Sequence, residues 1–144
     1  MLSQRSHYAL RAMLVLVAGD GVTPMRTGQI AKKASLSPKF LEGVLLELRK
    51  AGMLVSYRGC KGGFLLARPA HEISFADIVR VTDGSLALSV CTSDVAYACC
   101  DGCFDEAYCE IRRALMTARD ATVHVLKSYD LASAGSRMRS AGHL

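Results

Sequence analysis

Five of the six cysteines lie within a segment of nineteen residues. They are separated by seven, zero, two and five residues, and they are Cys91, Cys99, Cys100, Cys103 and Cys109. The chain is expected to be cytosolic, where thiols stay reduced, so we expect a metal or redox site here and not a disulfide framework. The sixth cysteine, Cys60, lies far from this segment in the sequence.

Three kinds of chemistry suit such a group of thiols. Iron–sulfur clusters are bound by several thiolates from a loop that shields them from water. A Cys-x2-Cys pair at Cys100 and Cys103, completed by two further cysteines, is also typical of tetrahedral zinc. Neighbouring thiols can instead form a disulfide switch that uses no metal. The spacing alone leaves iron–sulfur and zinc equally favoured.

Size and hydropathy place the chain among single-domain proteins with one core. It has 144 residues, of which 51% are hydrophobic, and this excludes disordered and collagen-like chains. No run approaches the roughly 20 apolar residues that span a bilayer, and the N-terminus does not have the form of a signal peptide. We therefore expect a cytoplasmic protein with no membrane partner.

Charge is divided unevenly along the chain. Residues 1–70 contain eleven Lys/Arg against three Asp/Glu, a net charge of +8, whereas residues 71–144 carry −3. A basic half joined to an acidic half indicates that the first half meets a polyanion. We find neither a nucleotide-binding glycine loop nor a paired acid and base, so we do not expect an enzyme.

The basic half has the pattern of a winged helix-turn-helix. A first helix, capped by Ser3 or Ser6, is expected to end near Ala18, and Thr27 can cap a short second helix. Ser37 and Pro38 read as the cap and first residue of a third helix. Two β-like runs, at 53–57 and 64–67, then flank a basic, glycine-rich turn. The predicted fold is mainly α with a small β-hairpin wing.

The acidic half is predicted to carry the cysteines and a long helix. A capping box at Ser74 and Asp77 begins a helix that Gly84 ends, and the Cys-rich loop follows. From Cys109 to about Tyr129 an apolar stripe recurs at helical spacing, which favours a dimerisation helix. The predicted organisation is a DNA-binding region at 1–84, a Cys-rich loop for the metal or redox site at 85–108, a dimerisation helix at 109–132 and a flexible tail at 133–144.

Several segments together resemble the IscR–NsrR–RirA family of bacterial winged-helix regulators. They are the opening His-Tyr-Ala-Leu-Arg-Ala-Met-Leu, Ser-Pro-Lys-Phe-Leu-Glu of the third helix, the wing Arg-Gly-Cys-Lys-Gly-Gly-Phe, and the terminal Cys-Glu-Ile-Arg-Arg-Ala-Leu. The resemblance covers about residues 1–132. It implies a homodimeric transcriptional regulator, expected to be a repressor, whose binding to a double-stranded operator responds to an iron–sulfur cluster.

Two groups of residues are candidates for contact with DNA. On the third helix, Lys39 can donate to guanine or phosphate and Glu42 can accept from cytosine. On the wing, Arg58 and Lys61 suit a minor groove or its phosphates. The resemblance implies DNA contacts at Lys39, Glu42 and Arg58. It adds two further positions, Pro38 and Gly43. Lys61 stands where a third glycine is usual in the family.

The resemblance also favours iron–sulfur, as [2Fe-2S] or [4Fe-4S], over zinc. It implies three cysteine ligands of which the last two lie about five residues apart, and Cys103 and Cys109 match these. Cys91 has the position expected of the first ligand. The additional candidates are Cys99, Cys100 and His7, and Arg112 stands where one family member has a ligating histidine. Cys60 is not expected to be a ligand, and a thiol that senses oxidants beside DNA is the hypothesis for it.

Overall fold

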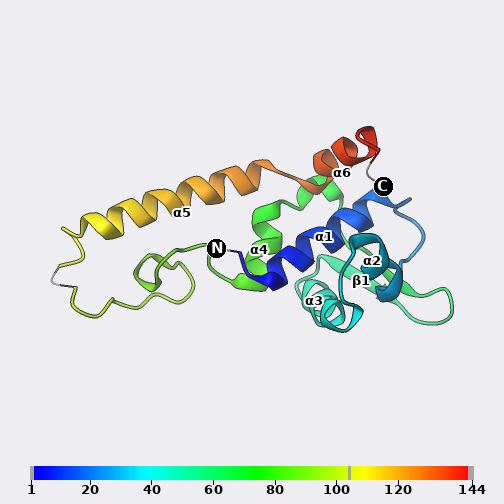
Figure 1. Cartoon of the computed structure of the whole chain (residues 1–144), viewed down its shortest axis with the longest axis horizontal. Helices are drawn as coiled ribbons and strands as arrows, with labels where there is room; N and C mark the ends of the chain where they lie inside the picture. Colours follow the sequence, from blue (N-terminus) through cyan, green and yellow to red (C-terminus); the bar gives the residue numbers. More distant parts are fainter. Residues whose placement is uncertain (1, 104, 143–144) are drawn as a thin grey trace.

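The computed structural model describes residues 2–103 and 105–142 and confirms a mainly helical chain with one β-hairpin. The elements are α1 (Gln4–Ala18), α2 (Thr27–Ala34), α3 (Pro38–Lys50), β1 (Leu54–Tyr57), β2 (Gly63–Leu66), the 3-10 turn η1 (Ala70–Glu72), α4 (Phe75–Asp83), the 3-10 turn η2 (Val90–Thr92), α5 (Glu110–Ser128) and α6 (Leu131–Ser140). In Figure 1, α1 to α4, the hairpin and α6 form a body, from which α5 and residues 85–103 and 105–109 extend as an arm. No helix in the described ranges is long and apolar enough to cross a membrane.

The first three helices begin and end close to where the sequence predicts. Ser3 caps α1 by accepting a hydrogen bond from the backbone N–H of Ser6. The expected cap of α2 at Thr27 is wrong, because Arg26 is the capping residue and its N–H donates to the side chain of Gln29 at 2.9 Å. Ser35, at a φ of 53°, turns the chain from α2 into α3. Ser37 and Pro38 then begin α3 as predicted.

Helix α3 buries one apolar stripe and leaves the other side free. The stripe repeats at intervals of three and four residues, which places its members on one face. All four side chains are buried in the core of the body: Leu41, Val44, Leu45 and Leu48. The same core includes the small residues Ala9 and Ala12 of α1, which let the helices approach closely. The orientation of α3 is therefore set by its own sequence pattern.

The wing is an antiparallel hairpin that is attached to the segment before α2. Its register pairs Leu54 with Leu66 and Tyr57 with Gly63. Met25 extends the pairing as an isolated bridge, exchanging backbone hydrogen bonds of 3.1 and 2.8 Å with Phe64. A two-stranded hairpin is marginal in isolation. The bridge at Met25 gives β2 a second partner and fixes the wing beside the helix-turn-helix.

Helix α4 has the predicted limits, with a capping box at Ser74 and Asp77 and Gly84 at its end, and the arm begins after Gly84. Helix α5 begins directly after Cys109, close to the predicted start. Cys109 also caps the helix, because its sulfur accepts from the N–H of Arg112 at 3.4 Å. Every residue of α5, all of them described, is at least partly exposed, and the helix rests on α4 and η2. The arm therefore lies outside the core, whose buried residues come from the body.

The predicted flexible tail at 133–144 is wrong for the residues up to 140. These belong to α6, which Asp130 caps by accepting from the N–H of Ser133 at 2.8 Å. Leu131 is fully buried, and its N–H donates to the carbonyl of Ile73 at 3.0 Å. The many Ser, Gly and Arg residues of this segment suggested a loose end, but a short apolar face packs it against α1. Residues 143–144 lie outside the described ranges.

Replacing Leu131 by alanine is expected to lower the free energy of unfolding by about 2–5 kcal/mol, because the buried side chain leaves a cavity. Val22→Ala is the control: Val22 is 78% exposed, so the change should stay within about 0.5 kcal/mol. Urea denaturation followed by circular dichroism measures both. If the two variants were equally stable, α6 would not be part of the folded body.

Candidate DNA-binding surface and cysteine loop

The face of α3 opposite the buried stripe is solvent-exposed and polar at its beginning. All four candidate residues on this helix are exposed: Pro38, Lys39, Glu42 and Gly43. They lie in the first two turns, the part of a recognition helix that reaches base edges in the major groove. Gly43 has open space around its Cα, so the helix surface is low at this point.

Contacts from α1, which the sequence did not predict, hold the beginning of α3 in place. The Tyr8 ring meets the Phe40 ring edge-on, with centroids 4.8 Å apart, and the Tyr8 hydroxyl accepts from the N–H of Ser37 at 3.4 Å. Further along, Arg5 forms an ion pair with Glu47. Both contacts join residues about thirty to forty positions apart, so helical periodicity contains no signal for them.

The tip of the wing exposes its two basic residues, Arg58 and Lys61, together with Cys60. The turn is possible because of Gly62 and Gly63. A Cβ atom at Gly62 would lie 2.2 Å from the carbonyl oxygen of Tyr57, and one at Gly63 would lie 2.5 Å from the backbone of Met25. These two glycines set the path of the tip. Lys61 extends from that path into solvent.

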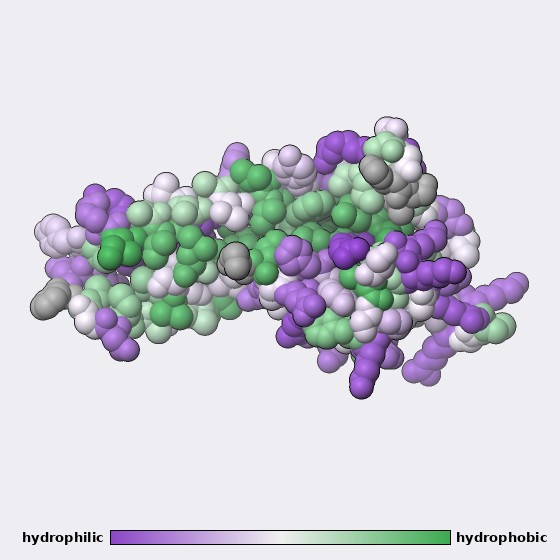
Figure 2. All heavy atoms as spheres, viewed as in Figure 1, coloured by the Kyte–Doolittle hydropathy of each residue, from purple (hydrophilic) through white to green (hydrophobic). Residues whose placement is uncertain are grey.

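Arg26 also attaches the wing tip to the start of α2, because its guanidinium donates to the carbonyl of Cys60. Sequence reasoning missed this role: Arg26 counted only toward the basic charge of the first half. Figure 2 shows hydrophilic side chains projecting from the side of the body that carries α3 and the hairpin, whereas hydrophobic atoms gather over the arm. The structure thus separates a polar, basic surface from an apolar one.

The cysteines of the loop differ in exposure. Cys91 is buried, Cys100, Cys103 and Cys109 are half-buried, and Cys99 is exposed. A hollow of about 430 Å³ is lined by three of them, Cys100, Cys103 and Cys109. Within the described residues, no three His, Cys, Asp or Glu side chains converge closely enough to hold one metal ion. The loop thus gathers its thiols around a hollow and along the start of α5.

The pKa of three of these thiols lies above its usual value. For Cys100 the largest cause is burial, followed by interaction with Cys103 and then with Cys91. Burial also raises the pKa of Cys103, and a hydrogen bond with Glu106 raises that of Cys99. Thiols that interact in this way are close neighbours in the loop. As a donor set of soft sulfur ligands, they fit an iron–sulfur group or zinc once they lose their protons.

Carboxylates of the loop are held by its own hydrogen bonds. The Tyr97 hydroxyl donates to Glu106, and this bond lowers the pKa of Glu106 and raises that of Tyr97 to about 12.

The remaining candidate ligand, His7, is exposed in the first turn of α1, which a hydrogen bond of 3.0 Å from Ser3 to Asp83 attaches to α4. The structure therefore places His7 on the body and not in the loop.

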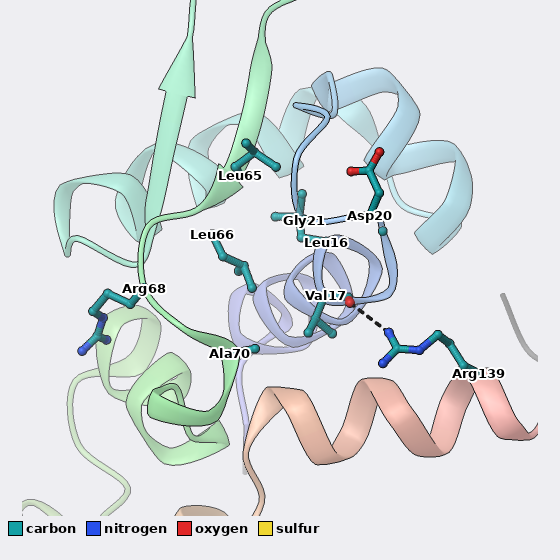
Figure 3. Close-up of a pocket in the computed structure, with 10 residues that line it drawn as sticks. Leu16, Val17, Asp20, Gly21, Leu65, Leu66, Arg68, Ala70 and Arg139 are labelled. Carbon is teal, nitrogen blue, oxygen red and sulfur yellow. Dashed lines mark hydrogen bonds between the residues drawn. The ribbon is translucent and has the colours of Figure 1, made fainter.

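A hollow of about 540 Å³ opens between the end of α1, β2 and α6 (Figure 3). Two of its charged residues are engaged within the chain. Arg139 donates to the carbonyl of Val17 at 3.2 Å, and Asp20 accepts from the N–H groups of Val22 and Thr23 at 2.9 and 2.7 Å. With the hydroxyl of Thr23 as the largest cause, these bonds lower the pKa of Asp20 to about 2. We assign this hollow to the packing of α6 against α1 and β2 within the body.

Comparison with known proteins gives consistent results. A family described as "Rrf2: Iron-dependent Transcriptional regulator" matches residues 2–135. A helix-turn-helix transcriptional regulator of Rhodobacter capsulatus, named rrf2-like, is 40% identical over 116 residues, or 78% of this chain and 77% of its own. The solved structure of CymR, the global cysteine regulator of B. subtilis, has a TM-score of 0.77 at 28% identity and covers 95% of this chain and 97% of CymR. T. potens IscR has a TM-score of 0.71 at 30% identity, over 92% and 83%.

Two glycine substitutions test the geometry of this surface in opposite directions. Gly43→Ala is expected to raise the free energy of unfolding by about 1 kcal/mol, because alanine favours a helix and the space is open. Gly63→Ala is expected to lower it by about 1–3 kcal/mol, because a side chain meets the backbone of Met25 at a positive φ of 151°. Thermal denaturation measures both. Equal stability of the two variants would contradict the described wing.

Proposed function

The chain belongs to the Rrf2 family of transcriptional regulators, which confirms the resemblance inferred from the sequence, and from this premise we propose that it is a cysteine-controlled, homodimeric DNA-binding repressor. The observation that carries the proposal is the exposed beginning of α3 beside a glycine-shaped, basic wing on one side of the body. A regulator of this kind acts where the DNA is, so we place it in the cytoplasm.

Direct contact with bases is assigned to α3. Its first turns enter the major groove, where Lys39 donates to guanine or to a phosphate and Glu42 accepts from cytosine. A glutamate on a DNA-facing surface weakens attraction to phosphates, so base recognition is its best physical role. Pro38 and Gly43 complete the surface, since Pro38 starts the helix and Gly43 lets the backbone approach the DNA. The wing then places Arg58 and Lys61 on the adjacent groove or its phosphates.

The homodimer is assigned to α5. This helix leaves the large apolar side chains of Ile111 and Val125 in solvent, with exposed fractions of 73% and 53%, and Tyr129, directly after it, is 46% exposed. Monomeric proteins rarely leave an apolar surface of this kind uncovered. A second copy of the same helix covers it symmetrically. It would also place two recognition helices at the spacing of one DNA turn, about 34 Å.

The cysteine loop is assigned to an iron–sulfur cluster, held by Cys103, Cys109 and one or more of Cys91, Cys99 and Cys100. Support comes from the clustered thiols, the hollow that three of them line, and a family described as iron-dependent. When bound, such a cluster supplies an anionic centre that responds to iron and redox state. The protein's part is to order the loop against α5, because Cys109 caps that helix. Loop and dimer interface are then coupled.

Zinc or a thiol switch is the alternative for the same loop. Cys100 interacts with both Cys103 and Cys91, so a two-electron oxidant would join two of these thiols as a disulfide, with the release of two protons. The solved structure of a cysteine regulator also covers almost the whole chain. In both alternatives Cys109 still links the loop to α5. They differ from the cluster proposal in the signal that is sensed and not in the DNA-binding surface.

The DNA prediction concerns sequence preference. Lys39→Ala and Glu42→Ala are each expected to alter which sites are selected from a random duplex pool. The lost base contact should change the binding free energy by about 1–3 kcal/mol at the base pair that the side chain contacts. Arg58→Ala is expected to weaken selected and random DNA evenly if Arg58 contacts phosphate. Fluorescence anisotropy at two salt concentrations measures the affinities, which should fall steeply with salt.

Gly28→Ala is the matched control for helix changes, since Gly28 lies in α2 with open space around it and away from the base edges. Its site preference should equal that of the wild type. DNA binding that survives the loss of both Arg58 and Lys61 would rule out the wing assignment.

The dimer prediction concerns α5. Val125→Glu is expected to weaken self-association by at least about 30-fold. Burying a charge in the interface costs at least about 2 kcal/mol of association free energy, the size of a hot-spot effect. Val22→Glu, at an exposed site on the body, is the control and should remain dimeric. Light scattering coupled to size-exclusion chromatography measures the mass. A Val125→Glu protein that stays dimeric would place the interface elsewhere.

The ligand prediction concerns the colour of anaerobically purified protein. Cys103→Ala and Cys109→Ala should each give colourless protein that contains no sulfide, yet they should fold normally because the core lies in the body. Cys60→Ala should keep the cluster, and at least one of Cys91, Cys99 and Cys100 should be dispensable. Absorption spectra with iron and sulfide analysis decide this. Stoichiometric zinc without sulfide would support the alternative.

A further inference from the structure

Two arginines of α5 hold the short turn η2 that carries Cys91. Arg112 Nε donates to the carbonyl of Cys91 at 3.1 Å, and Arg119 Nη1 donates to the carbonyl of Thr92 at 2.5 Å. The two arginines are seven residues apart, which places them on the same face of the helix, two turns from each other. We call this pair the arginine clamp.

The clamp satisfies two carbonyls for which the described residues provide no backbone donor. Within η2, the carbonyls of Ser89 and Val90 accept from the N–H groups of Thr92 and Ser93. The next two carbonyls, of Cys91 and Thr92, receive the guanidinium bonds instead. Cys91 and Thr92 are only 5% and 2% exposed, and a buried carbonyl without a partner is costly. The arginines therefore determine whether this turn can stay packed on α5.

Arg112 is bonded to two of the loop cysteines at once. Its guanidinium holds the carbonyl of Cys91, and its backbone N–H donates to the sulfur of Cys109 at 3.4 Å. Arginine has no acceptor and stays protonated, so it is not a metal ligand itself. Arg112 can instead fix the separation of two candidate ligands, Cys91 and Cys109.

Cys99 is held differently. It is exposed, and its side chain interacts with Glu106 and with other members of the loop. Cys91 is thus the candidate that is fixed directly to the helix carrying Cys109. In Figure 1, the loop leaves the body, runs beside α5 and joins the N-terminal end of that helix. A contact that fixes the loop near Cys91 therefore limits the path of the residues that follow.

We propose that Arg112, supported by Arg119, is a positioning residue that holds the backbone of Cys91 against the start of α5 and thereby favours Cys91 over the exposed Cys99 as a ligand alongside Cys103 and Cys109. The assignment of ligands rests on the proposed cluster function, whereas the clamp itself is a property of the metal-free chain. Arg112 stands where one family member has a ligating histidine. In this chain the position is thus occupied by a residue that orients a different ligand, Cys91.

The clamp is tested first on the metal-free, reduced, full-length protein. Iodoacetamide labelling for increasing times, with fragment-ion mapping of each cysteine, gives the rate at Cys91 relative to exposed Cys60 in the same sample. Arg112→Gln combined with Arg119→Gln should raise this relative rate at least about tenfold, since two charge-assisted hydrogen bonds no longer oppose local opening. An increase of less than about threefold would overturn the clamp.

Arg113→Gln is the matched control. Arg113 is the next residue on α5 and forms an exposed ion pair with Glu110 at 3.0 Å, so its loss should leave Cys91 labelling unchanged. Arg119→Gln alone serves if the double variant does not fold. The core cluster lies in the body, so the circular dichroism melt of each variant should resemble that of the wild type.

The ligand assignment is tested on anaerobically reconstituted protein. Sulfide content and the rate of iron loss to a chelator should be near wild type in Cys99→Ala, and Cys91→Ala should retain no cluster. Arg112→Gln should lose iron at least about tenfold faster than Arg113→Gln. Wild-type retention in Cys91→Ala would overturn the assignment. If the wild type itself takes up no iron and sulfide, the proposed function fails, and the labelling experiment still decides the clamp.

Discussion

The packing of α1 against the rest of the body is the constraint on which the other features depend. Its buried face contacts α2, α3, α4, α6 and the wing strand β2, and it is built from small and flexible residues such as Ala9, Ala12 and Met13. Since a well-packed core tolerates only small shifts, the helices around α1 have few alternative orientations. The outward face of α3, the attachment of the wing and the docking of α6 all follow from this packing.

The arm obeys a different rule, because it is excluded from that core. Helix α5 rests on α4 and η2 and keeps every described residue partly exposed. Elements with few buried contacts open locally at a low free-energy cost while the body remains folded. This division gives a physical basis for regulation: the loop and α5 can change their arrangement without unfolding the DNA-binding surface. Any such coupling is reciprocal, so DNA would favour the same loop state that favours DNA.

The polar contacts of the arm explain how the Cys-rich loop can influence α5, the helix that directly follows it in the sequence. Cys109 both caps α5 and belongs to the group of thiols, and Arg112 bonds to the first and the last cysteine of the loop. A change at the thiols therefore acts on the first turn of α5, where backbone N–H groups depend on side-chain acceptors. The wing need not be touched by the signal, since it is attached to the body at Met25 and Arg26.

Local patterns were sufficient to predict most elements. The sequence alone determined several features that depend on neighbours within a few residues: the Ser37–Pro38 start, the capping box at Ser74, the glycine-rich hairpin and the start of α5 at Cys109. The pairing of Tyr8 with Phe40, the bridge from Met25 to Phe64 and the clamp on Cys91 join segments that are distant in the chain. Helix α6 was missed for the same reason: its short apolar face is stable only against α1, so the tertiary structure, and not local propensity, decided that it folds.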